Sequence, residues 1–385
     1  MFDKILDKIK PTKGEFNEIK KLVNSVLKEI KIKDAKPVVG GSFAKDTWLS
    51  GIHDIDIFVK FNYKKYKDRS KKIDGLLYKG IKKLKPKRLH GSRDYFQIKK
   101  GKLTFEIVPI LDIRKASQAV NITDVSPLHA LWVKKHKLHN DIRLSKAFAR
   151  AHHVYGAETH IRGFSGYVLE ILTIYYGGFM KFVRGVSKWK GKTVIDPEKL
   201  LKKPLKELNT SKISSPLVLV DPVDKARNAA AVVSKEKYDT LIKAAKLFLK
   251  NPSERYFLLK EEKIPKNAIA IEIKPKKGKS DVVAGKLFAL FNKIKRQIKL
   301  EGFGLKKSGF IFDGKAVFWF VFKSNKLSEY KEIRGPPLKL KKHVEQFRKK
   351  HKKTVVKKGF VCTKESRKFT DAEKFVKLLY RKLYK

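Results

Sequence analysis

Residues 40–59 read GGSFAKDTWLSGIHDIDIFV, a glycine pair and a serine followed by two aspartates one residue apart. The end of this stretch is rich in β-branched and aromatic residues and predicts a strand. Side chains alternate along a strand, so Asp54 and Asp56 share one face while the isoleucines beside them turn to the core. Two like charges side by side repel, and a divalent metal ion such as Mg²⁺ would offset that repulsion.

The glycine pair predicts a turn that binds phosphate, because a backbone without side chains can approach an anion closely. Acidic pairs and glycine turns also occur, each alone, in strands and turns without such a role. Their order and spacing here favour a metal-dependent site for a nucleoside triphosphate.

The composition predicts a polyanionic partner. Among 385 residues, 92 lysines and arginines stand against 38 aspartates and glutamates, a formal net charge of +54. This excess is far beyond what solubility needs. The sequence has no apolar run long enough for a membrane-spanning helix, and its basic residues are spread along the chain, so nucleic acid is favoured over a membrane.

Cys362 is the only cysteine, which excludes an intramolecular disulfide and a multi-thiolate metal site. The first residues, MFDK, do not resemble an apolar signal segment, so we expect a cytoplasmic protein. The sequence leaves the oligomeric state open, with a homodimer as one arrangement.

Apolar periodicity predicts the remaining architecture. Helices are expected over residues 1–32, with a break at 11–14, and over most of 115–185. Residues 94–109 predict a hairpin around a KKGK turn, and 217–220 predict a short buried strand. Residues 221–231 are expected to begin a helix at Asp221-Pro222. From residue 251 the order strand, helix, strand, strand indicates a small α+β module with a basic end.

Gly41-Ser42 followed by Asp54-Ile55-Asp56 resembles the signature of the DNA polymerase β-type nucleotidyltransferases. Within that superfamily the sequence is similar to the archaeal (class I) CCA-adding enzymes, the tRNA nucleotidyltransferases. The similarity spans residues 36–350 and includes PxH at 127–129, NDxRLxK at 140–146, VYG at 154–156, RGFSGY at 162–167 and DPxDxxRNxA at 221–230.

The resemblance implies an α+β protein in three parts: a polymerase β-like catalytic head over residues 1–114, a helical neck over 115–250, and a body with a basic tail over 251–385. It implies template-independent addition of CMP, CMP and AMP, from CTP and ATP, to the 3′ end of tRNA. The last part would bind the acceptor and T arms of the tRNA, which fits its positive charge.

The resemblance also implies the site residues. Asp54, Asp56 and Glu106 would hold two Mg²⁺ ions, although the family has an aspartate where Glu106 stands. Asp112 is a competing ligand, and Glu106 could also be an ordinary solvent-facing strand residue. A larger set of residues would bind the nucleotide: Gly41, Ser42, Lys45, Ser126, His129, Lys146, Tyr155 and Arg227. Of these, Arg227 would help to select the base.

Two alternatives remain at this point. Another nucleotidyltransferase of the superfamily, such as a poly(A) polymerase, would use the same carboxylates. A non-catalytic RNA-binding protein that kept the fold is the alternative of a different class.

Overall fold

The computed structural model of the protein describes residues 1–51, 54–259, 263–276 and 278–384. The chain is an α+β protein that forms two compact units, Met1–Lys260 and Glu261–Lys385. The predicted catalytic head and neck therefore both fall in the first unit. In the described part of the chain, no helix is long and apolar enough to cross a membrane.

A five-stranded mixed sheet opens the first unit. Its strand order is β1 (Ala35–Val39), β2 (Asp54–Phe61), β5 (Leu103–Leu111), β4 (Tyr95–Lys100), β3 (Lys87–Leu89). β2 and β5 are parallel, and the other neighbours are antiparallel. The register places Asp56 opposite Glu106. The predicted strand after the aspartates and the predicted hairpin of β4 and β5 are both confirmed.

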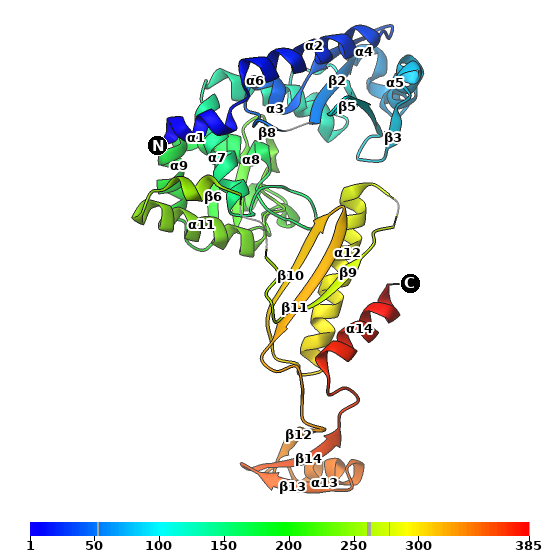
Figure 1. The fold of residues 1–385 in the computed structure, drawn as a ribbon, viewed down its shortest axis with the longest axis vertical. Helices are drawn as coiled ribbons and strands as arrows, with labels where there is room; N and C mark the ends of the chain where they lie inside the picture. The colour runs from blue at the N-terminus through cyan, green and yellow to red at the C-terminus, as the bar shows by residue number, and fades with distance from the viewer. Residues whose placement is uncertain (52–53, 260–262, 277, 385) are drawn as a thin grey trace. The chain divides into compact units, whose positions relative to one another are not determined.

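One face of this sheet is covered by helices, because alternate residues of β2 are apolar. Ile55, Ile57 and Val59 are buried together with residues of α2 (Lys13–Glu29) and α5 (Ile73–Ile81). Figure 1 shows α2 lying along the sheet. α2 starts after Thr12, whose side chain accepts a hydrogen bond from the backbone N–H of Glu15. The preceding helix is α1 (Phe2–Ile9), so the predicted break is confirmed.

The rest of the first unit is mainly helical, as predicted. Its longer helices are α6 (Ser126–Lys135), α7 (His139–Ala151), α8 (Gly166–Tyr176), α9 (Phe179–Ser187) and α11 (Lys235–Lys250), and a shorter one is α10 (Pro204–Glu207). Two further short helices, α3 (Gly41–Ala44) and α4 (Tyr63–Tyr66), belong to the connections of the five-stranded sheet. α8 ends at Gly177, which has the left-handed conformation typical of a helix C-cap. The core of this part packs α7, α8, α9 and α11 together.

The helix expected over residues 221–231 is wrong. The chain instead forms β7 (Leu217–Asp221) and β8 (Asp224–Asn228), an antiparallel pair in a small sheet with β6 (Thr193–Ile195). The Asp221 side chain accepts a hydrogen bond from the backbone N–H of Val223 at 3.0 Å, which closes a turn rather than capping a helix.

The second unit contains two further sheets. β9 (Ile269–Ile273), β10 (Leu305–Asp313) and β11 (Lys315–Phe322) form one, packed on α12 (Ser280–Leu300) and α14 (Ala372–Leu383). β12 (Tyr330–Pro337), β13 (Thr354–Lys357) and β14 (Phe360–Ser366) form the other, with α13 (Lys341–Lys350) against β12. The strand–helix–strand–strand order predicted for this region is confirmed.

Candidate active site

The three predicted metal ligands lie on one face of two neighbouring strands, which we call the carboxylate face (Asp54, Asp56 and Glu106). Asp54 and Asp56 alternate with buried isoleucines on β2, and Glu106 lies across from Asp56 on β5. Because paired residues of parallel strands point the same way, Glu106 projects from the same side as the aspartates. The amide of Gln97 on β4 lies 3.5 Å from the Glu106 carboxylate.

The glycine turn supports Asp56 directly. The backbone N–H of Gly40 donates to the Asp56 carbonyl at 2.8 Å. Gly41 has a φ of +57°, and a β-carbon at that position would overlap Oδ2 of Asp56. Glycine is therefore required twice over, by the backbone conformation and by the close carboxylate. Ser42 follows in the single turn of α3, half-buried beside the same carboxylate strand.

The charge of Asp54 and Asp56 on the carboxylate face is poorly compensated within the described part of the chain. Burial raises the pKa of Asp56, the neighbouring Asp54 adds to the rise, and the positive charge of Lys45 opposes it. Among the described residues, no lysine or arginine forms an ion pair with Asp54 or Asp56. Within the same part of the chain, no three acidic, histidine or cysteine side chains are gathered closely enough to hold a metal ion.

Asp112, the competing ligand, lies elsewhere. It follows β5 at the end of the β2–β5 pair opposite to Asp54, where its backbone N–H donates to the Phe61 carbonyl. Its side chain is half exposed and pairs with Lys60 at 2.6 Å. Glu106, not Asp112, therefore lies beside the two aspartates.

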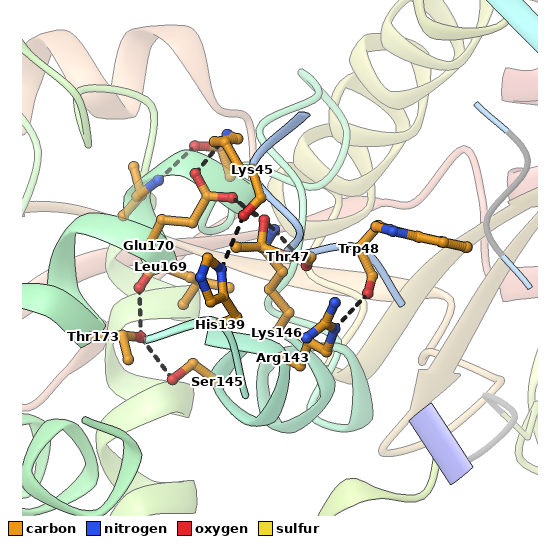
Figure 2. A network of polar contacts seen from close by, with 12 residues as sticks. Lys45, Thr47, Trp48, His139, Arg143, Ser145, Lys146, Leu169, Glu170 and Thr173 are labelled. Atoms are coloured by element: carbon orange, nitrogen blue, oxygen red, sulfur yellow. Dashed lines mark hydrogen bonds and ion pairs between the residues drawn. The ribbon is translucent and has the colours of Figure 1, made fainter. Parts of the chain in front are cut away.

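A buried group that we call the lysine cluster (Lys45, Thr47, Lys146 and Glu170) joins the glycine turn to the helices (Figure 2). Glu170 on α8 is fully buried. Its Oε2 accepts a hydrogen bond from Lys45 at 2.6 Å, and its Oε1 accepts from Lys146 and from the Thr47 hydroxyl, both at 2.8 Å. Lys146 on α7 also donates to the carbonyl and the hydroxyl oxygen of Thr47, at 3.0 and 2.9 Å.

The charges of this cluster perturb one another. Burial alone would raise the pKa of Glu170, but the charges and hydrogen bonds of Lys146 and Lys45 lower it to about 2. Burial lowers the pKa of Lys146 to about 8, against the attraction of Glu170. Tyr155 lies beside this cluster, and burial together with the nearby Glu170 raises its pKa to about 12.

Arg143 and His139 extend the contact between the glycine turn and α7. Arg143 is fully buried, donates to the Trp48 carbonyl at 3.0 Å and pairs with Asp46 at 2.5 Å. The Nδ1 atom of His139 lies 3.1 Å from the Lys45 carbonyl (Figure 2). The segment that carries the glycine turn is thus attached to the helices by both its backbone and its side chains.

A second polar group, the aromatic cluster (His129, Tyr167, Asp221 and Arg227), lies between α6, α8 and β7–β8. The rings of His129 and Tyr167 stack with centroids 4.1 Å apart. The buried Asp221 carboxylate contacts all three partners, at 3.1 Å to His129, 3.1 Å to the Tyr167 hydroxyl and 2.8 Å to Arg227. Burial opposes its ionisation, but His129, the backbone N–H of Val223 and the charge of Arg227 lower the pKa of Asp221 overall. Arg227 stays one-third exposed.

The structure brings the predicted residues together in three groups rather than one. Gly41 and Ser42 lie with the carboxylate face, Lys45, Lys146 and Tyr155 with Glu170, and His129 and Arg227 with Asp221. Ser126 is the first residue of α6, a helix that contacts α3.

The sequence interpretation missed Thr47, Tyr167, Glu170 and Asp221 as site residues. Glu170 could have been found, because it is the one charge in the apolar helix GYVLEILTIYY. A charge inside such a helix needs a buried partner of opposite sign.

Three family models match the chain along its length. A nucleotidyltransferase domain matches residues 19–122, the second domain of tRNA nucleotidyltransferase matches 140–258, and the C-terminal domain of the CCA-adding enzyme matches 266–382.

Curated relatives agree with these matches. A CCA-adding enzyme of Nanoarchaeum equitans is 36% identical over 357 residues, which are 89% of this chain and 87% of the relative. A CCA-adding enzyme of Sulfolobus acidocaldarius is 32% identical over 386 residues, covering 97% of this chain and 89% of the relative.

Solved structures of similar fold include a cytoplasmic RNA terminal U-transferase, with a TM-score of 0.53 and 16% identity over 68% of this chain and 98% of that one. The Cid1 poly(U) polymerase gives a TM-score of 0.51 at 15% identity over 67% of this chain and 98% of that one. At this identity the likeness concerns the fold alone.

Proposed function

Because this chain belongs to the archaeal CCA-adding enzymes, a family of tRNA nucleotidyltransferases, we propose that it adds CMP, CMP and AMP to the 3′ end of tRNA, using CTP and ATP and no template. The observation that carries the proposal is the pairing of Asp56 with Glu106 beside a glycine turn whose Gly41 touches Asp56. This arrangement joins acidic ligands to a turn that admits a phosphate.

The donor chemistry of the carboxylate face fits a divalent cation. Carboxylate oxygens are hard ligands of the kind that Mg²⁺ takes together with substrate phosphates. Burial raises the pKa of Asp56 and the neighbouring Asp54 adds to the rise, so a bound cation would favour the ionised form of this acid. We propose that Asp54, Asp56 and Glu106 hold Mg²⁺ in a two-ion site, with the substrate completing its coordination. Because the three side chains are not gathered around one point in the structure, they would have to approach one another on binding.

In the proposed reaction the 3′ hydroxyl oxygen of tRNA attacks the α-phosphorus of the nucleotide. A new P–O bond forms, the bond to pyrophosphate breaks, and the hydroxyl proton passes to solvent. Bound Mg²⁺ would lower the pKa of that hydroxyl and offset the negative charge of the triphosphate. Gly41 and Ser42 bind phosphate oxygens, and Lys45, Lys146 and Tyr155 line the triphosphate side.

The aromatic cluster would receive the nucleoside. Arg227 has a partly exposed guanidinium held by Asp221, and its planar donors suit the edge of a base. His129 and Ser126 would contact the nucleoside from α6. The acceptor and T arms of tRNA would lie on the second unit, where binding rests on the excess of basic residues. The cytoplasmic location and the homodimer expected from the sequence stay predictions.

A tRNA that lacks its 3′ end tests the proposal. With CTP alone the protein should add two residues and stop, with ATP alone it should add none, and with both it should add three. Repeated addition from ATP alone would instead indicate a poly(A)-type enzyme. Binding of tRNA without any extension, in the presence of Mg²⁺, would indicate a non-catalytic RNA-binding protein.

A further inference from the structure

Glu170 receives hydrogen bonds from three side chains that belong to two parts of the first unit. Lys45 and Thr47 come from the segment after the glycine turn, and Lys146 comes from α7. The carboxylate is fully buried, so water cannot replace any of these partners. One side chain of α8 thus fixes the position of the segment that follows the phosphate-binding turn.

The two lysines of the cluster differ in the number of hydrogen bonds that their ammonium groups donate. Lys146 donates to three oxygens, two of Thr47 and one of Glu170, which accounts for every N–H of an ammonium group. Lys45 donates to Glu170, and its ammonium forms no second hydrogen bond within the described part of the chain. Lys45 therefore keeps donors for another anion, whereas Lys146 has none to spare.

Lys45 directly follows α3, whose Gly41 touches Asp56, and its positive charge opposes the rise in the pKa of Asp56. Two ammonium groups around one carboxylate leave the lysine cluster with one positive charge in excess. An anionic group bound between this cluster and the carboxylate face would neutralise that positive charge. On the proposed function, the group at this place is the triphosphate of the nucleotide.

We infer that Glu170 is a positioning residue for the triphosphate: it holds Lys45 in place to bind the phosphates, while Lys146 and Thr47 fix the turn to the helices. This inference rests on the proposed function. The triphosphate is common to CTP and ATP, so Glu170 should affect both nucleotides equally.

Glu170→Gln tests the inference, because it keeps the shape of the side chain and removes the charge between two lysines. At saturating tRNA, we expect the KM for CTP on tRNA without its end, and the KM for ATP on tRNA ending in CC, to rise by the same factor of about ten or more. The affinity for inorganic tripolyphosphate, measured by calorimetry, should fall by a similar factor, and the affinity for tRNA should not change.

Thr173→Val is the matched control. Thr173 lies one turn further along α8, is buried, and contacts Ser145 of α7 at 2.7 Å without touching the lysines (Figure 2). Its loss should leave both KM values and the tripolyphosphate affinity close to those of the original protein. If both variants weaken tripolyphosphate binding alike, Glu170 has only a structural role and the inference is wrong.

Thr47→Val provides a second variant that keeps every charge, in case Glu170→Gln does not fold. It removes one donor to Glu170 and one acceptor from Lys146, and should raise both KM values by about threefold to tenfold. Unchanged KM values in a folded variant would overturn the inference. If the unaltered protein extends no tRNA, the proposed function fails; if it does and these variants match it, only the role of Glu170 fails.

Discussion

The carboxylate face and the lysine cluster both contact the glycine-turn segment. They differ in how far nearby positive charges compensate their acidic groups. In the lysine cluster each oxygen of Glu170 has a cationic partner, and the pKa of this acid is lowered to about 2. On the carboxylate face the pKa of Asp56 is raised instead. A charge whose partners are already in place stabilises a fold, whereas a charge that lacks them is poised to bind something else.

The largest expected effect is that of Asp56→Asn. Nucleotidyl transfer should fall by about a thousandfold or more, since a carboxylate that binds the metal is lost. The thermal midpoint should rise, because the raised pKa means that the folded state disfavours the ionised Asp56 at neutral pH.

The measurements for Asp56→Asn are an extension rate and a melting curve. Asp112→Asn is its control, at the other end of the same strand pair, and should keep the rate. A drop in both activity and stability for Asp56→Asn would mean that this acid has a structural role in the fold.

Glu106 distinguishes a metal ligand from a solvent-facing residue. Glu106→Gln should slow extension by about a hundredfold, because an amide is a poorer ligand than a carboxylate. Glu106→Asp should stay within about tenfold of the original rate, because it keeps a carboxylate at this position. The rates are compared under single-turnover conditions. Equal rates for all three proteins would mean that Glu106 is not a metal ligand.

The smallest effect is on stability at low pH. The pKa of Glu170 is about 2 in the folded protein and 4.5 ordinarily, so its ionised form stabilises the fold above pH 4.5. That contribution, about 3 kcal/mol, is lost as the pH falls from 4.5 towards 2.

Urea unfolding of the original protein and of Glu170→Gln at several pH values measures this contribution. The free energy of unfolding should decline more steeply in the original protein. If the free energies of unfolding of both proteins declined in parallel, ionised Glu170 would add no stability to the fold.

Local patterns predicted much of the fold. The break before Thr12, the strand of Asp54 and Asp56 and the hairpin that carries Glu106 depend on near neighbours in the sequence. The error at residues 221–231 has a local cause as well. The side chain of Asp221 accepts a hydrogen bond from the N–H two residues later. Aspartates bind nearby backbone N–H groups both in helix caps and in tight turns, so the sequence Asp221-Pro222 is compatible with either structure.

The site was predicted less completely, because its buried partners are distant in sequence. Lys45 and Glu170 lie 125 positions apart, and nothing near either residue indicates that they meet. The motifs predicted Lys146 as a nucleotide ligand, but its three hydrogen bonds to Thr47 and Glu170 appear only when α7 and α8 are packed. Charge balance in a core is a tertiary property.

The attachment of the glycine turn to α7 and α8 also bears on how the first unit unfolds. Residues 40–48 hydrogen-bond to β2 through Gly40 and to the helices through Lys45, Thr47 and Trp48. Neither the sheet nor the helices can open without exposing charges that are now buried. Heat should therefore melt both in a single cooperative transition, and amide hydrogen exchange in β2 and in α8 should require the same global opening.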